Sequence, residues 1–193
     1  ISFFTFTQIA FLVDAHKNKA EEYDFVHYGI FVTFFPHLLA GPIYHHREIM
    51  PQFAKPSTYK FSSENLAIGL TIFFIGMFKK VGLADQFALL ADPVFNAAAK
   101  GESLHFLKSW TGATAYSLQL YFDFSGYMDM AIGLSRTIGV KLPVNFDSPY
   151  KSVNIIEFWR RWHITLGRFL RDYLYIPLGG NQKGAKRQAI NVL

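Results

Sequence analysis

The sequence predicts an all-α, multi-pass transmembrane protein, and three observations support this class. Hydrophobic residues make up 51% of the chain and aromatic residues 18%. Asp, Glu, Lys and Arg together reach only 17%, against about 25% in an ordinary soluble domain. Several apolar runs are long enough for helices, and no stretch shows the alternating pattern of a half-buried strand.

Both ends of the chain lie in apolar sequence. It begins at Ile1 within ISFFTFTQIAFLV and stops at Leu193, where AINVL becomes apolar again. A charged n-region and a small-residue cleavage site are both missing, so the first run is not a signal peptide. We therefore expect residues 1–193 to be a single membrane domain, an internal piece of a longer protein that is truncated at both ends.

The composition excludes several other classes. Disordered chains carry few aromatic residues and much charge, and this chain has the opposite balance. Its net charge of +5 is scattered along the sequence, whereas a nucleic-acid partner would require a basic face. The chain contains no cysteine, which removes disulfides, thiolate catalysis and cysteine-ligated zinc.

The longest stretch without Asp, Glu, Lys or Arg is 25–46. As a helix its 22 residues would span about 33 Å, enough for the hydrocarbon core. Pro36 and Pro42 lie within it, and prolines at membrane depth require protein or a water-filled cavity around them. A buried helix of a large soluble protein remains the alternative for this segment.

A second apolar helix is expected after the polar connector 46–65. Ser63 suits a helix start, and LAIGLTIFFIGMF follows until the pair Lys79–Lys80, where we expect the helix to stop. Gly69 and Gly76 lie seven residues apart on it, a spacing that favours close helix packing in lipid.

The next segment, VGLADQFALLADPVF, reads as a short amphipathic helix that Pro93 ends. A long helical region follows from residue 104 to residue 140. Asp123, Ser125 and Asp129 lie in its second half, and carboxylates in so apolar a helix must face a partner or water. We favour a structural polar cluster over direct chemistry for these residues.

The last helix is predicted to begin at Asn154, which forms a capping box with Glu157. Residues 155–175 then continue as one helix until Pro177 and the glycine pair that follows it. One face carries aromatic and leucine side chains, and arginines occupy much of the rest. Such a composition suits a helix near the lipid–water boundary.

His163 is the candidate for chemistry among the seven histidines. It follows Arg160, Arg161 and Trp162 in the densest aromatic and cationic stretch of the chain. Nearby positive charge would hold its imidazole neutral, the form that accepts a proton. A histidine that merely anchors an interfacial helix is the alternative.

We expect no metal site. The pair His45–His46 with Glu48 is too compact to match known metal-ligand spacings. Motifs for a nucleophilic serine, a Walker loop and a dinucleotide-binding loop are also missing from the sequence.

Three motifs resemble the bacterial membrane-bound O-acyltransferase family, with the alginate O-acetylation branch as the nearest. They are FFPHLLAGPI at 34–43, QLYFDFSGYMDMAIGL at 119–134 and EFWRRWHITLGRFLRDYLYIPLGGN at 157–181. The resemblance extends over essentially all 193 residues. It implies a multi-pass protein of the bacterial inner (cytoplasmic) membrane.

The resemblance also implies a reaction and its participants. An acyl group would pass from a cytoplasmic thioester donor, acetyl-CoA or an acyl carrier, to hydroxyls of an extracytoplasmic polysaccharide such as alginate, with no bound cofactor. Membrane lipid and periplasmic acetyltransferase proteins are the implied partners.

The resemblance assigns roles to individual residues. His163 corresponds to one of the two histidines that mark the family, and the other lies in a W-H-G motif that this chain lacks before Leu193. Trp162 and the arginines beside it, Arg160 and Arg161, would stabilise the developing oxyanion. Asp123, Asp129 and Asp172 would be polar supports.

Three alternatives remain open at this point. The shared motifs do not separate acetyl transfer from D-alanyl transfer to teichoic acid. Intramembrane aspartate and histidine also suit a proton-coupled transporter without transfer chemistry. A structural subunit that passes acyl groups to a periplasmic transferase is the third.

Overall fold

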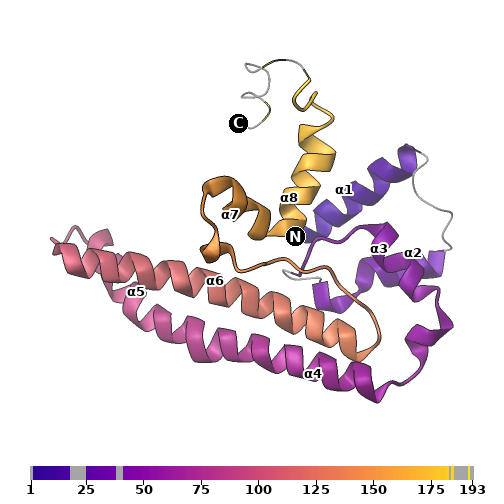
Figure 1. Ribbon diagram of the computed structural model, residues 1–193, viewed down its shortest axis with the longest axis horizontal. Helices are drawn as coiled ribbons and strands as arrows, with labels where there is room; N and C mark the ends of the chain where they lie inside the picture. Colours follow the sequence, from indigo (N-terminus) through magenta and orange to yellow (C-terminus); the bar gives the residue numbers. More distant parts are fainter. Residues whose placement is uncertain (1, 18–24, 38–40, 183, 185–190, 192–193) are drawn as a thin grey trace. The chain divides into compact units, whose positions relative to one another are not determined.

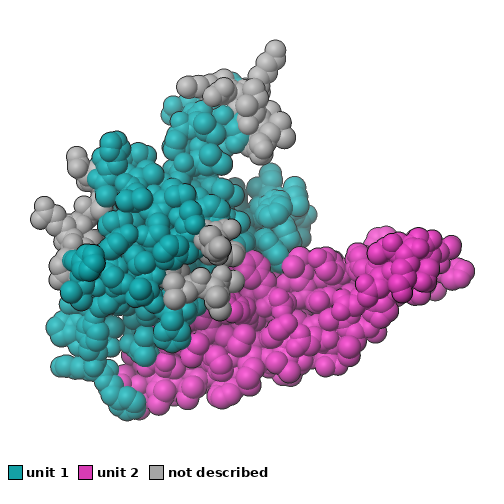
Figure 2. All heavy atoms as spheres, turned by 180° about the vertical axis from the view of Figure 1, so that it is seen from behind, with its two compact units in different colours: residues 1–61, 138–193 teal, residues 62–137 magenta. Residues whose placement is uncertain are grey.

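The computed structural model describes the chain except for residues 1, 18–24, 38–40, 183, 185–190 and 192–193 (Figure 1). Every regular element in the described residues is helical, which confirms the all-α prediction. The chain divides into two compact units (Figure 2). Residues 1–61 and 138–193 form unit 1, and residues 62–137 form unit 2.

Unit 2 is a helical hairpin. Its first arm consists of α4 (Ser63–Met77), the π-helical segment η3 (Phe78–Ala84) and α5 (Asp85–Ala99). Its second arm is α6 (Phe106–Thr137), a helix of 32 residues that confirms the long helix expected between residues 104 and 140. Ser62 caps α4 by accepting a hydrogen bond from the backbone N–H of Asn65 (3.2 Å).

The first arm corrects two expectations. The helix does not stop at Lys79–Lys80, and Pro93 lies inside α5 instead of ending it. Each lysine pairs with an aspartate of α6, so the helix can continue past both charged side chains. Lys79 Nζ lies 2.6 Å from Asp129 Oδ2, and Lys80 Nζ lies 2.6 Å from Asp123 Oδ1.

Residues Ser63–Ala99 form a candidate membrane span of 37 residues, and no second helix of the described residues is both long and apolar enough to qualify. Only 11% of its most apolar window is buried, which favours a lipid-facing helix over the core helix of a soluble protein. Several spans remain a prediction.

Glycines bring the two arms of unit 2 together, as the spacing of Gly69 and Gly76 predicted. A Cβ on Gly69 would lie 2.7 Å from the carbonyl oxygen of Gly133. One on Gly76 would lie 2.5 Å from the carbonyl oxygen of Gly126. Residue numbers rise along α4 while those of the contacted residues on α6 fall, so the two arms run antiparallel. The glycines let the two backbones touch where side chains would otherwise separate them.

Unit 1 is built from shorter helices. Its first half contains α1 (Ser2–His16), α2 (Phe25–Thr33), η1 (Phe35–His37), α3 (His46–Phe53) and η2 (Pro56–Tyr59). The segment 25–46 is therefore not one membrane-length helix, since α2 ends at Thr33 and η1 is a separate 3-10 turn. Pro36 lies within that turn.

The second half of unit 1 contains η4 (Pro149–Lys151), α7 (Ile155–Arg161), α8 (Ile164–Leu170) and η5 (Arg171–Tyr175). The Asn154 cap is confirmed, because its side chain accepts from the backbone N–H of Glu157. The Glu157 side chain accepts from the backbone N–H of Val153, the residue before the cap, instead of that of Asn154 as in a full capping box. The single helix expected over 155–175 is wrong, however: the chain breaks at His163.

A small apolar core joins α1 to α8 in unit 1. Ala10, Ile43 and Phe169 are buried together, and the ring of Phe169 lies 4.8 Å from that of Phe6. This core holds residues 43–46 beside α8 and so positions the polar side chains described below.

We expect Gly133→Ala to destabilise the full-length protein in detergent by about 1–3 kcal/mol, the usual cost of overpacking. The new Cβ would lie 2.6 Å from both the carbonyl oxygen of Gly69 and the backbone nitrogen of Phe73. The matched control is Gly29→Ala in α2, where a Cβ meets nothing within 4 Å. Thermal unfolding of both variants measures the difference, and equal midpoints would contradict close packing at Gly133.

Candidate functional site

The break between α7 and α8 places His163 in an exceptional backbone conformation. Its φ of 46° and ψ of 52° are left-handed, which costs a residue other than glycine about 1–2 kcal/mol. Trp162 N–H closes α7 by donating to Phe158, and the carbonyl of His163 accepts the first bond of α8, from Gly167. His163 therefore separates α7 from α8, where the sequence predicted one continuous helix.

Asn145 holds this break in place from a loop that precedes α7. Its side-chain oxygen accepts from the backbone N–H of Thr165 (3.0 Å) and from the Thr165 hydroxyl (3.0 Å). The same oxygen lies 3.2 Å from Nδ1 of His163. Its backbone carbonyl accepts from Ile164 N–H (3.0 Å). Asn145, His163 and Thr165 are all buried.

These contacts determine which ring nitrogen of His163 carries the proton. A backbone N–H can only donate, so the Asn145 atom facing Thr165 must be the oxygen and not the amide nitrogen. An oxygen in that position requires a donor from His163 as well. The Nδ1–H tautomer follows, and the lone pair of the neutral ring lies on Nε2.

Burial keeps His163 neutral. The residue lies outside the candidate membrane span and is only 8% exposed, and burial lowers the pKa of its imidazole to about 4. Charge repulsion from the neighbouring arginines, the cause expected from the sequence, is not what lowers it. Arg161 instead contacts Glu157 (2.7 Å) and Asp147 (3.4 Å), and Arg160 is exposed.

Trp162 belongs to an aromatic cluster beside the break. Its ring stacks on Phe158 with centroids 5.6 Å apart and on Tyr150 at 6.3 Å. Phe146 meets it edge-on at 5.0 Å. Trp162 therefore packs in an aromatic cluster beside His163.

The three aspartates expected as supports fall in different places. Asp123 and Asp129 lie in unit 2, paired with Lys80 and Lys79, which agrees with the structural polar cluster favoured from the sequence. Asp172 lies in unit 1, where it pairs with Arg171 (2.7 Å). These contacts join none of the three to His163.

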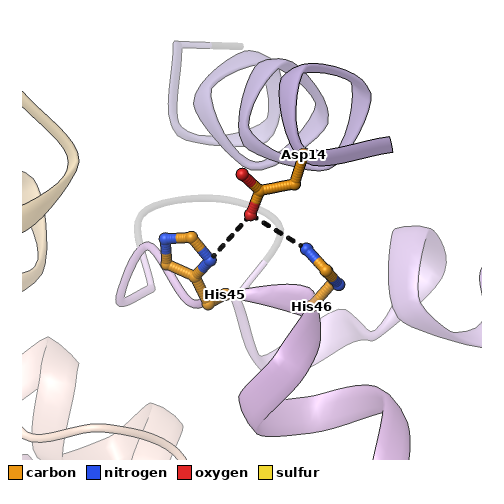
Figure 3. A group of neighbouring side chains, drawn as sticks. All are labelled: Asp14, His45 and His46. Carbon is orange, nitrogen blue, oxygen red and sulfur yellow. Dashed lines mark hydrogen bonds and ion pairs between the residues drawn. The ribbon is translucent and has the colours of Figure 1, made fainter. Parts of the chain in front are cut away.

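A second polar cluster in unit 1 was missed by the sequence analysis. Asp14 of α1 reaches His45 and His46 at the start of α3 (Figure 3). Its Oδ2 atom lies 3.1 Å from Nε2 of His46 and 3.7 Å from Nδ1 of His45. The Tyr173 hydroxyl donates to the same oxygen at 2.9 Å. The paired histidines were the available signal, but nothing in the sequence placed Asp14 beside them.

A cavity of about 380 Å³ adjoins this second cluster. Asp14, His45 and Tyr173 line it, together with the charged residues Lys17, Arg47 and Asp172. Of the three aspartates that the sequence predicted as polar supports, Asp172 is the one that lines this cavity. A polar ligand can reach the Asp14 cluster through the cavity.

Comparison with known proteins identifies the relatives of the chain. The model of MBOAT, the membrane-bound O-acyltransferase family, matches residues 2–193. The peptidoglycan O-acetyltransferase of Helicobacter pylori is 50% identical over 94% of the chain. The probable alginate O-acetylase AlgI of Pseudomonas aeruginosa is 44% identical over 94% of it. The teichoic acid D-alanyltransferase of Bacillus subtilis is 32% identical over 91%.

The matched region is a minor part of each relative. The chain spans 39%, 34% and 44% of the lengths of these three proteins, respectively. Alginate and peptidoglycan relatives both exceed 40% identity, so the expected preference for the alginate branch is not established.

We expect Asn145→Ala to lower the unfolding temperature of the full-length protein far more than Asn154→Ala. The first change leaves buried donors of Thr165 and His163 without an acceptor, at about 1–3 kcal/mol for each unsatisfied group. The second removes one exposed helix cap, worth about 1 kcal/mol. A smaller or equal effect of Asn145→Ala in a thermal scan would show that the Asn145 network does not hold the break.

Proposed function

Since this chain belongs to the membrane-bound O-acyltransferase family, we propose that it is part of an enzyme that moves an acyl group, acetyl in our proposal, from a thioester donor to hydroxyls of a polysaccharide. The donor is acetyl-CoA or an acyl carrier on the cytoplasmic side, and the acceptor lies outside the inner membrane. The observation that carries the proposal is a neutral, buried histidine in a fixed tautomer within the family's matched region.

The chemistry sets the role of His163. A hydroxyl is a poor nucleophile at neutral pH, so its proton must be accepted as the oxygen attacks the thioester carbonyl. A pKa of about 4 makes His163 a weak base but a dependable hydrogen-bond acceptor at Nε2. We therefore assign it the role of orienting the acceptor hydroxyl, while the second family histidine, in the W-H-G motif expected beyond Leu193, removes the proton.

The bonds and the proton of the proposed transfer step are as follows. The hydroxyl oxygen forms a bond to the carbonyl carbon, the carbon–sulfur bond breaks, and the proton passes through the base to the leaving thiolate. Donors beside the carbonyl would stabilise the oxyanion. Arg160 is exposed and is our candidate donor, since the ring of Trp162 is packed among Phe158, Tyr150 and Phe146.

The acceptor is a cell-envelope polysaccharide in this proposal. Relatives named for peptidoglycan and alginate O-acetylation share 43–50% identity with the chain. D-alanyl transfer to teichoic acid is the second candidate, supported by the 32% identity of the Bacillus relative. D-alanyl transfer is the weaker candidate because the identity of this relative is lower. Membership of an acyltransferase family gives no support to the alternative of a transporter without transfer chemistry.

The setting of the reaction follows from the same proposal. The enzyme lies in the bacterial inner membrane with several spans, in contact with lipid. Periplasmic acetyltransferase proteins are the proposed partners that carry the acyl group further, and the acyl thioester is a substrate of the reaction.

We expect His163→Ala in the full-length protein to reduce ester-linked acetyl on envelope polysaccharides by about 2- to 12-fold, the effect of losing a neutral hydrogen bond of about 0.5–1.5 kcal/mol. Mass spectrometry of polysaccharides from cells lacking the gene, complemented with each variant, gives the measurement. His105→Ala, at an exposed histidine of unit 2, is the matched control and should restore acetylation fully.

Each other outcome has a definite meaning. Normal acetylation by His163→Ala at equal protein level would remove His163 from the reaction. Loss of alanyl ester in place of acetyl would move the protein to the teichoic-acid branch. If deletion of the gene alters neither ester, the acyltransferase proposal itself is wrong.

A further inference from the structure

The Asp14 cluster presents three donor atoms of the kind that bind transition metals. Asp14 comes from α1, while His45 and His46 come from the start of α3 (Figure 3). One carboxylate oxygen and one nitrogen from each imidazole lie within 4.8 Å of one another. No contact described above for His163 uses any of these side chains.

The distances suit one small cation. Zinc binds imidazole nitrogen and carboxylate oxygen at about 2.0–2.2 Å, so ligand atoms of a tetrahedral site lie about 3.3 Å apart. Asp14 Oδ2 lies 3.1 Å from His46 Nε2 and 3.7 Å from His45 Nδ1. The two imidazole nitrogens lie within 4.8 Å of each other, so a movement of up to about 1.5 Å by one ring brings all three atoms to the spacing of a zinc site.

The chemistry of the donors favours a transition metal. Two imidazoles and one carboxylate with an open position bind Zn²⁺ in many proteins and Fe²⁺ in others, whereas Mg²⁺ and Ca²⁺ prefer oxygen ligands alone. The site also has a preformed support. The Tyr173 hydroxyl donates to the metal-facing oxygen of Asp14 at 2.9 Å, the kind of outer contact that fixes a ligating carboxylate.

Burial and access are both suitable. The side chains of His46, Asp14 and His45 are 0%, 10% and 22% exposed, so little water competes for the metal. The cavity of about 380 Å³ opens on Asp14, His45 and Tyr173, and it leaves room for a fourth ligand such as water.

We propose that Asp14, His45 and His46 bind one Zn²⁺ ion, with its fourth position open to the cavity beside Tyr173. The site ties α1 to the start of α3, two elements of unit 1, and its ligands Asp14 and His46 are 32 residues apart in the sequence. Its position on the cavity wall allows a water or an anionic oxygen group to bind the zinc.

The test uses the full-length protein in detergent, purified without a histidine tag, stripped with a chelator and dialysed against Zn²⁺. Elemental mass spectrometry then counts the bound metal. Wild-type protein should hold one more equivalent of zinc than Asp14→Asn and His45→Gln. Replacement by Co²⁺ should give visible absorption bands in wild-type protein that both variants lack. The affinity of each variant for the metal should be at least about 10-fold weaker than that of wild type.

His105→Gln is the matched control, because this exposed histidine lies in unit 2, and it should keep the full zinc content. His45 is part-exposed, so His45→Gln keeps the test valid if Asp14→Asn fails to fold. Equal zinc in wild type and His45→Gln, or no zinc in wild type, would overturn the proposal. Because metal content is read directly, this outcome is independent of whether the protein transfers acyl groups.

Discussion

Three donors converge on the side-chain oxygen of Asn145: the backbone N–H and hydroxyl of Thr165, and Nδ1 of His163. The left-handed backbone at His163 depends on these bonds, because this conformation costs a residue other than glycine about 1–2 kcal/mol, which the contacts of Asn145 offset. The Thr165 hydroxyl also accepts from Ile43 N–H at 3.1 Å. One buried amide therefore fixes the α7–α8 break and links it to the segment that leads into His45 and His46.

The same constraint accounts for the state of the histidine. Burial disfavours the charged imidazolium, and the Asn145 oxygen selects the Nδ1–H tautomer. A ring held in this way presents its Nε2 lone pair at any pH well above 4, which suits recognition of a hydroxyl better than proton removal. In unit 2, by contrast, Lys79 and Lys80 neutralise Asp129 and Asp123, so charge there serves the packing of the hairpin.

Local sequence was sufficient for features that depend on neighbouring residues. The helix over 106–137, the Asn154–Glu157 cap and the glycine contacts of Gly69 and Gly76 were all predicted. The break at His163 was not, because the aromatic periodicity continues through it and Asn145 is 18 residues away. Lys79–Lys80 failed as a stop for the same reason, since their partners lie on α6. Asp14 joins the paired histidines only through the packing of α1.

Histidine ¹⁵N NMR on the full-length protein in detergent shows whether Asn145 holds a neutral His163 as the Nδ1–H tautomer. A His163→Gln sample assigns the resonance, and a pH series follows its protonation. We expect an Nδ1–H signal that persists through neutral pH and titrates near pH 4. An Nε2–H tautomer, or titration near the ordinary value of about 6.5, would contradict it.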